Sequence, residues 1–170
     1  RAMVPGRGAR GIAQLVRHCG SAAAVLYSAP SAREQVARVS RKALRLLDRD
    51  DGASTAQLLE RADAAGQVVL VPTDSGYPVR LRTIPDPPPV LVALGDLSCA
   101  NMPAIAIVGS RDHTRYGGEV AKRLAEVAAA AGVVVVSGMA RGLDAVAQVA
   151  ALAAGGRSIA VLGSGADVVY

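Results

Sequence analysis

The chain has 170 residues, and 51% of them are hydrophobic, a globular composition that supports one full core or two small ones and excludes a disordered protein. The uncharged apolar run at residues 127–140 contains glycines and falls short of the roughly 20 residues that a membrane span needs, so no membrane segment is expected. The net charge of +5 comes from residues 1–66, with 11 Lys and Arg against 6 Asp and Glu, because residues 67–170 carry 8 of each.

Targeting and metal-binding signals are both missing. Residues 1–11 are basic, but no apolar block with a small-residue cleavage site follows them, so a secretory signal is not expected. Cys19 and Cys99 are the only cysteines, and neither stands at metal-ligand spacing from a second cysteine or a histidine pair. We therefore predict a cytoplasmic protein with two reduced thiols and no metal site.

Residues 1–65 are predicted to form a small all-helical domain. Apolar residues recur at helical spacing from residue 11 onward, and glycine and proline break the pattern into short helices. The clearest helix is expected from Ser31, as N-cap, to Leu47. One face of this helix is basic, and a solvated surface, a nucleic-acid contact and a protein-docking surface all fit that face. Its residues are Arg38, Arg41, Lys42, Arg45 and Arg49.

Residues 66–170 are predicted to form the N-terminal part of an extended Rossmann-like domain of the α/β class. Two short β-branched runs, at 68–71 and 90–94, indicate edge strands that a proline-rich connector joins. Both helices of the following alternation are long enough to be crossovers, so its three strands are expected to be parallel. The sheet is expected to be truncated after its third parallel strand. The alternation is strand 104–109, helix 118–131, strand 133–137, helix 143–154 and strand 158–163.

The carboxyl ends of the three parallel strands are the candidate binding site. Ligands collect at that edge of an open parallel sheet, and here it carries three glycine-bearing turns and two arginines. Glycine lets a backbone approach a ligand, and helix N-termini supply free N–H groups and partial positive charge. The geometry of a tight turn is enough to explain the glycine in any single one of these turns. The three turns and the two arginines taken together indicate an anionic, phosphate-bearing ligand. The candidate residues are Gly109, Ser110, Arg111, Arg115, Gly138, Arg141 and Gly163.

Three residues near these turns have more than one explanation. Asp144, early in the second helix, either stabilises the helix dipole or holds Arg141. Arg115 and Tyr116 either face the binding crevice or begin the first helix.

Known nucleotide fingerprints and catalytic groups are missing from this edge. The dinucleotide motif needs G-x-G-x-x-G after the first strand and an acidic residue at the end of the second, and the P-loop needs Lys-Ser or Lys-Thr after its glycines. The chain has neither, and its only histidines, His18 and His113, lie in no recognisable catalytic pattern. We therefore predict a binding protein that is not an enzyme and uses no cofactor.

Several motifs of the second half form a specific pattern together. They are residues 107–111 (Ile-Val-Gly-Ser-Arg), Tyr116-Gly117, residues 136–144 (Val-Ser-Gly-Met-Ala-Arg-Gly-Leu-Asp), Gly155-Gly156 and residues 159–163 (Ile-Ala-Val-Leu-Gly). Upstream, Tyr77-Pro78 and the segment from Pro87 to Leu97 belong to the same pattern. This pattern resembles the DNA-processing protein A family, also called DprA or Smf. The resemblance covers residues 66–170 strongly and the N-terminal helices loosely, through residues 20–26.

The resemblance implies a protein that binds single-stranded DNA without strong sequence preference, protects incoming DNA and loads the RecA recombinase in natural transformation. It implies that Arg111 contacts a backbone phosphate and that Arg141 supports the pocket. It also implies a homodimer in the full-length protein and an N-terminal domain like a sterile-alpha-motif or helix-hairpin-helix unit. The residues that would shape the pocket are Gly109, Ser110, Gly138 and Gly163.

The chain departs from the family pattern in two respects. Gln148 stands where the family commonly has histidine, and the later half of the family's Rossmann domain, with further basic residues and the surface for dimerisation and RecA contact, is expected beyond Tyr170. In addition, Tyr116 is the only aromatic residue near enough in sequence to stack on a base. An alternative function is a nucleotide-binding or nucleoside-monophosphate-hydrolysing enzyme on a related Rossmann-like fold, which would need a catalytic glutamate from outside this sequence.

Overall fold

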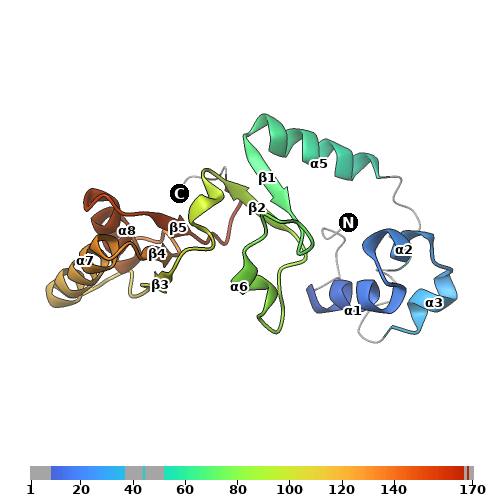
Figure 1. Cartoon of the computed structure of the whole chain (residues 1–170), viewed down its shortest axis with the longest axis horizontal. Helices are drawn as coiled ribbons and strands as arrows, with labels where there is room; N and C mark the ends of the chain where they lie inside the picture. Colours follow the sequence, from blue (N-terminus) through green and yellow to red (C-terminus); the bar gives the residue numbers. More distant parts are fainter. Residues whose placement is uncertain (1–8, 37–43, 45–51, 167, 169–170) are drawn as a thin grey trace. The chain divides into compact units, whose positions relative to one another are not determined.

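The structure is a computed structural model that describes residues 9–36, 44, 52–166 and 168 (Figure 1). The chain divides into two compact units, residues 1–95 and residues 96–170. Within the described ranges, no helix combines the length and the apolar composition needed to cross a membrane.

Three short helices open the first unit: α1 (Ala9–Cys19), α2 (Ala22–Tyr27) and α3 (Pro30–Glu34). α2 begins after Ser21, whose hydroxyl accepts the backbone N–H of Ala24 at 2.9 Å. The predicted series of short helices is therefore confirmed. Their apolar side chains meet in a small core made of Leu15, Val25, Val36 and Leu44.

The helix predicted from Ser31 to Leu47 is wrong at its start and in its continuity. α3 begins after Ala29 with Pro30 in its first turn, a position that suits proline because its φ is preset and its missing N–H needs no partner there. The helix ends at Glu34, and Val36 is outside it and enters the core, where its side chain is 9% exposed. The basic face predicted for the rest of this helix lies outside the described residues: Arg38, Arg41, Lys42, Arg45 and Arg49.

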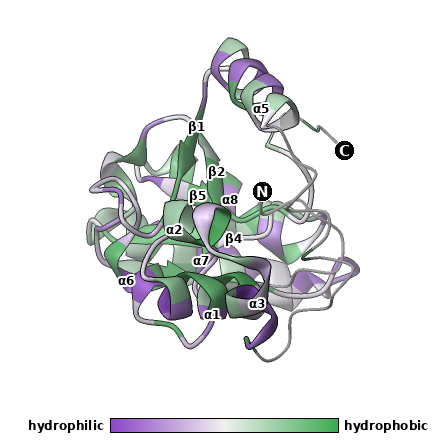
Figure 2. Ribbon diagram, turned by 90° about the vertical axis from the view of Figure 1, so that its right-hand side faces the viewer, coloured by the Kyte–Doolittle hydropathy of each residue, from purple (hydrophilic) through white to green (hydrophobic). Residues whose placement is uncertain are grey.

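A helix and an antiparallel strand pair follow in the first unit. They are α5 (Ala53–Ala64), β1 (Gln67–Leu70), the short helix α6 (Val79–Arg82) and β2 (Leu91–Leu94). β1 pairs with β2 from Gln67 opposite Leu94 to Leu70 opposite Leu91, and Figure 2 shows both strands as mostly hydrophobic. α5 packs against β1. The two predicted edge strands are therefore partners in one small sheet.

Tyr77 closes the loop between β1 and β2. Its side chain is fully buried, and its hydroxyl donates to the carbonyl of Pro88 at 2.8 Å. Arg82 stacks over the ring, 6.0 Å from the ring centre. Burial raises the pKa of the Tyr77 hydroxyl, and the charge of Arg82 partly offsets the increase. The tyrosine and the proline-rich connector are therefore parts of one closed loop.

The second unit is a parallel α/β layer. A 3₁₀ turn, η1 (Leu97–Cys99), precedes β3 (Ala104–Ala106), α7 (Arg115–Ala130), β4 (Val134–Ser137), α8 (Leu143–Ala153) and β5 (Ser158–Ala160). The strand order is β3-β4-β5, and both pairs are parallel, with Ile105 opposite Val135 and Val135 opposite Ser158. The predicted order of strands and helices and the parallel direction are confirmed.

Both long helices of this unit cover one face of the sheet. α7 and α8 pack on each other, and both pack on the central strand β4, as Figure 1 shows. The contact is close because the core between them is made of small side chains. The buried residues of this core are Ala125, Ala128, Val135, Ala147, Ala150 and Ala151.

Candidate nucleic-acid interface at the strand ends

The turns that follow β3 and β4 lie against each other at the carboxyl edge of the sheet. β3 and β4 are parallel neighbours, so both strands end at the same edge. The backbone N–H of Leu143 donates to the carbonyl of Ser110 at 3.1 Å, which joins the second turn to the first. The structure therefore brings residues 109–111 and 138–142 together.

A buried carboxylate joins the same two turns. Asp144, in the first turn of α8, is 6% exposed. Its Oδ1 accepts the backbone N–H of Gly109 at 3.0 Å, and its Oδ2 accepts that of Gly138 at 3.1 Å. This double contact is not predictable from the sequence, because no local pattern links Asp144 to a glycine 35 positions earlier. Both strand-end N–H groups are thus already hydrogen-bonded within the chain.

Glycine fits these turns because the turns pack on each other, and at Gly142 it is required because the obstacles there are backbone atoms. At Gly142, φ is +95° and an added Cβ would lie 2.3 Å from the carbonyl oxygen of Ser110. An added Cβ at Gly109 would lie 2.4 Å from Cδ1 of Leu143, and one at Gly138 would lie 2.9 Å from the carboxylate that joins the turns. These close approaches are internal to the chain, so they explain the glycines without a ligand.

Two further predicted residues, Ser110 and Gly163, differ in how the chain uses them. The Ser110 hydroxyl donates to the carbonyl of Asp112 at 2.7 Å and accepts the Asp112 N–H at 3.1 Å, so its hydrogen is engaged within the loop. Gly163 is exposed after β5, and no atom lies within 4 Å of the Cβ position. Packing therefore does not require glycine at position 163.

Three exposed arginines, Arg111, Arg115 and Arg141, form what we call the arginine rim. In the part of the chain that the structure describes, none of their guanidinium groups has a hydrogen bond or an ion pair. The backbones of Arg111 and Arg141 are adjacent, because a Cβ on Gly142 would lie 2.6 Å from the Cα of Arg111. The rim therefore presents free positive charge at the strand ends.

The N-terminus of α7 lies in the same segment as the rim. Thr114 caps the helix by accepting the N–H of Gly117 at 3.1 Å, so Arg115 is the first helical residue. The following Tyr116 is 80% exposed. Exposed arginine and tyrosine side chains thus follow each other at the start of α7.

Met139, in the turn after β4, has a φ of +57°, a conformation that costs a non-glycine residue roughly 1–2 kcal/mol.

Gln148 has a structural position, away from the strand ends. Its side chain is 8% exposed, and its Nε2 donates to the hydroxyl of Ser158 at 3.0 Å and to the carbonyl of Ile159 at 3.3 Å. The Ser158 hydroxyl donates in turn to the carbonyl of Val135 at 2.9 Å. Gln148 therefore ties α8 to β5, and β5 to β4.

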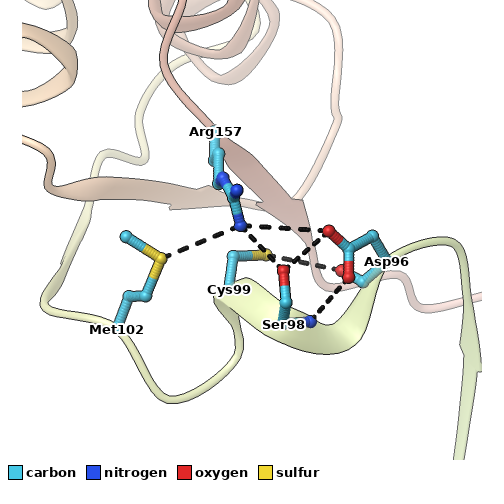
Figure 3. Close-up of polar contacts among 5 residues, drawn as sticks. All are labelled: Asp96, Ser98, Cys99, Met102 and Arg157. Carbon is cyan, nitrogen blue, oxygen red and sulfur yellow. Dashed lines mark hydrogen bonds and ion pairs between the residues drawn. The ribbon is translucent and has the colours of Figure 1, made fainter.

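Arg157 belongs to a separate polar cluster at the amino end of β5 (Figure 3). Its Nη1 donates to the hydroxyl of Ser98 at 2.7 Å and lies 3.9 Å from Oδ2 of Asp96. Asp96 accepts the Ser98 N–H at 2.8 Å and the Ser98 hydroxyl at 2.7 Å, and thereby caps η1. Parallel strands place this cluster at the edge opposite the arginine rim, so Arg157 joins η1 to the sheet and is not part of the candidate interface.

The Asp96 cluster is expected to lose its contribution to stability in acid. The two hydrogen bonds from Ser98 hold the pKa of Asp96 below its ordinary value of 3.8, and the charge of Arg157 acts in the same direction. The carboxyl group is more acidic in the folded chain than in the unfolded chain. Its stabilising contribution is therefore complete above pH 3.8 and is lost as the pH falls through the lower folded pKa.

An NMR titration of the Ser98 backbone amide checks this expectation. The amide should shift at a lower pH than it does in a short reference peptide, and Asp96→Asn should abolish the shift. If the Ser98 amide shifted at the same pH in the protein and in the reference peptide, the hydrogen bonds of the cluster would not lower the pKa of Asp96.

Comparison with protein families identifies the relatives of the chain. The family model for DNA recombination-mediator protein A matches residues 68–170. The chain belongs to this family. Among curated members of the DprA family, Protein Smf of Synechocystis is 40% identical over 118 residues, which is 67% of this chain and 30% of that protein. DprA of Bacillus subtilis is 40% identical over 95 residues, which is 55% of this chain and 32% of that protein. The chain thus spans about a third of the length of these relatives.

Solved structures of DprA proteins share the fold. DprA of Streptococcus pneumoniae superposes with a TM-score of 0.80 at 26% identity, over 97% of this chain and 56% of that chain. DNA processing protein A of Helicobacter pylori, whose structure concerns its single-stranded DNA binding mode, superposes with a TM-score of 0.51 at 30% identity, over 61% of this chain and 46% of that chain. The Rossmann-like α/β fold expected from the sequence is confirmed.

Proposed function

We propose that this chain provides a DNA-backbone contact in a recombination mediator that binds single-stranded DNA. The arginine rim carries the proposal: it presents three exposed guanidinium groups, free of partners among the described residues, at the edge of a parallel sheet where such folds bind ligands. The single-stranded DNA binding mode of the Helicobacter pylori protein, which shares the fold at 30% identity, supports the same ligand here.

The chemistry of the rim suits phosphate better than bases. An arginine presents a planar fork of N–H donors that grips a phosphate through two charge-assisted hydrogen bonds. Phosphates repeat along every strand, so such contacts bind DNA of any sequence and weaken as salt rises. Tyr116, which is 80% exposed, offers a surface on which one base stacks. Gly109, Ser110 and Gly138 would shape the turns that bear these arginines, and Gly163 would shape the neighbouring turn after β5.

The wider proposal concerns the whole protein. In it, residues 1–65 form a helical module and residues 66–170 the first part of the DNA-binding domain, a boundary that falls between α5 and β1. The complete protein is a cytoplasmic homodimer that protects incoming single strands and loads RecA in natural transformation, and it acts by binding without catalysis or a cofactor. Membership of the recombination-mediator family supports this role.

Substitution of Arg111 tests the proposed contact. Arg111→Ala in the full-length protein is expected to weaken binding of fluorescent oligo-dT about tenfold at low salt, because one charged phosphate contact is lost. Arg111→Lys should bind with intermediate affinity, because lysine keeps the charge but lacks the fork. Fluorescence anisotropy measures both affinities.

The matched control is Arg123→Ala. Arg123 is an exposed arginine on α7, paired with Glu126 at 3.7 Å, and its removal should leave DNA affinity unchanged. Undiminished binding by Arg111→Ala across a salt titration would take Arg111 out of the interface.

A further inference from the structure

The carboxylate of Asp144 occupies the position in which a bound anion is expected in this fold. The N–H groups of Gly109 and Gly138 follow two parallel strands, where backbone N–H groups commonly hold a ligand's phosphate. Both groups instead donate to Asp144, at 3.0 and 3.1 Å, and the carboxylate is almost completely buried. The chain therefore supplies its own anion at this point.

Asp144 acts between elements and not within its own helix. An acidic residue in a first helical turn commonly caps or stabilises that helix. Here each oxygen contacts a different turn: Oδ1 reaches Gly109, 35 positions earlier, and Oδ2 reaches Gly138, 6 positions earlier. One side chain thus sets the spacing of the turns after β3 and β4.

The carboxylate already holds the donors that a phosphate would use. Asp144 is 6% exposed, and its two oxygens accept the backbone N–H groups of Gly109 and Gly138. A phosphate would have to displace the carboxylate to reach these groups, because two negative charges that share the same donors repel each other.

We infer that Asp144 is a positioning residue that holds the turns bearing Arg111 and Arg141 and keeps DNA phosphates on the outer arginine rim. Arg111 follows Gly109 by two residues, and Arg141 follows Gly138 by three, so both arginines extend from anchored points. The inference rests on the proposed function for its ligand, whereas the anchoring itself does not depend on DNA.

Asp144→Asn tests the inference, because it keeps the size of the side chain but turns one oxygen into an NH₂ donor that faces a backbone N–H. In ¹⁵N-labelled protein without DNA, the Gly109 and Gly138 amide resonances should shift and exchange faster with solvent. Binding of oligo-dT should weaken about tenfold, because both arginines must then be ordered on binding. The dependence of affinity on salt should stay unchanged, because no positive charge is lost.

Asp112→Asn is the matched control, because it removes the same charge from an exposed position in the loop after β3, which bears Arg111. It should leave both glycine resonances in place and should not weaken DNA binding. Tighter binding by Asp144→Asn would overturn the inference, because it would mean that phosphate takes the vacated glycine N–H groups.

A titration of the wild-type protein keeps the inference testable if Asp144→Asn does not fold. On addition of oligo-dT, the arginine Nε resonances of the rim should shift and the Gly109 and Gly138 amides should not. Large shifts of the two glycine amides would overturn the inference. Absence of any DNA binding by the wild-type protein would refute the proposed function, while the exchange rates of the two amides without DNA would still report on the anchoring by Asp144.

Discussion

Replacing Gly142 by alanine is expected to destabilise the second unit by about 3 kcal/mol or more. Two costs combine at this position. The backbone φ is +95°, which strains any residue with a side chain, and the added Cβ would lie 2.3 Å from the Ser110 carbonyl and 2.6 Å from the Arg111 Cα. Because both obstacles are backbone atoms, relief requires the turns to separate. Urea unfolding followed by circular dichroism measures the loss.

Gly155→Ala separates the two costs. Gly155 also has a positive φ, +76°, but no atom lies within 4 Å of its Cβ position. This control should lose only the backbone term, about 1–2 kcal/mol. Equal losses for Gly142→Ala and Gly155→Ala would mean that the clash of the added Cβ with the backbone of Ser110 and Arg111 costs nothing.

The second large effect concerns the salt dependence of DNA binding. Replacing the whole arginine rim, Arg111, Arg115 and Arg141, by alanine should lower the slope of log affinity against log salt by about 2, since each single-strand phosphate contact contributes about 0.7. Between 50 and 200 mM salt, the wild-type protein should therefore lose about twentyfold more affinity than the triple variant. Anisotropy titrations with oligo-dT at several salt concentrations give both slopes.

Lys122→Ala combined with Arg123→Ala is the control for this measurement. Both residues are exposed on α7, outside the turns at the strand ends. Their removal lowers the net charge of the protein by two but should leave the slope unchanged. An equal decrease per charge in the control would show that the protein binds DNA through its general positive charge and not at the rim.

The pattern of strands and helices in the second unit was largely predictable. Apolar runs separated by helix-length amphipathic segments leave few arrangements other than parallel strands with crossover helices. The boundaries were less predictable. The sequence pattern predicts a helix from about residue 118 and leaves Arg115 and Tyr116 either facing the crevice or beginning the helix. α7 begins at Arg115, because Thr114 caps it.

The role of the strand-end glycines was predicted less well. Glycines and arginines follow the first two parallel strands, and these residue types at the carboxyl edge of a sheet indicate an anion site. The residues are Gly109, Arg111, Gly138 and Arg141. Their residue types do not reveal whether the glycine N–H groups face a ligand or the chain. Ser110 likewise offers a hydroxyl by its type, but that hydroxyl hydrogen-bonds within its own loop.

By itself, the sequence determined the α/β class, the parallel direction of the strands and the arginines at the strand ends, because these follow from local periodicity and from the length of the crossover connections. Only the tertiary structure decided which groups at that edge remain free. Asp144 reaches Gly109 across 35 residues because β3 and β4 are neighbours, and hydrogen bonds between such distant positions leave no periodic signal in a sequence. The same contact occupies the backbone donors and leaves the arginine side chains as the exposed positive groups.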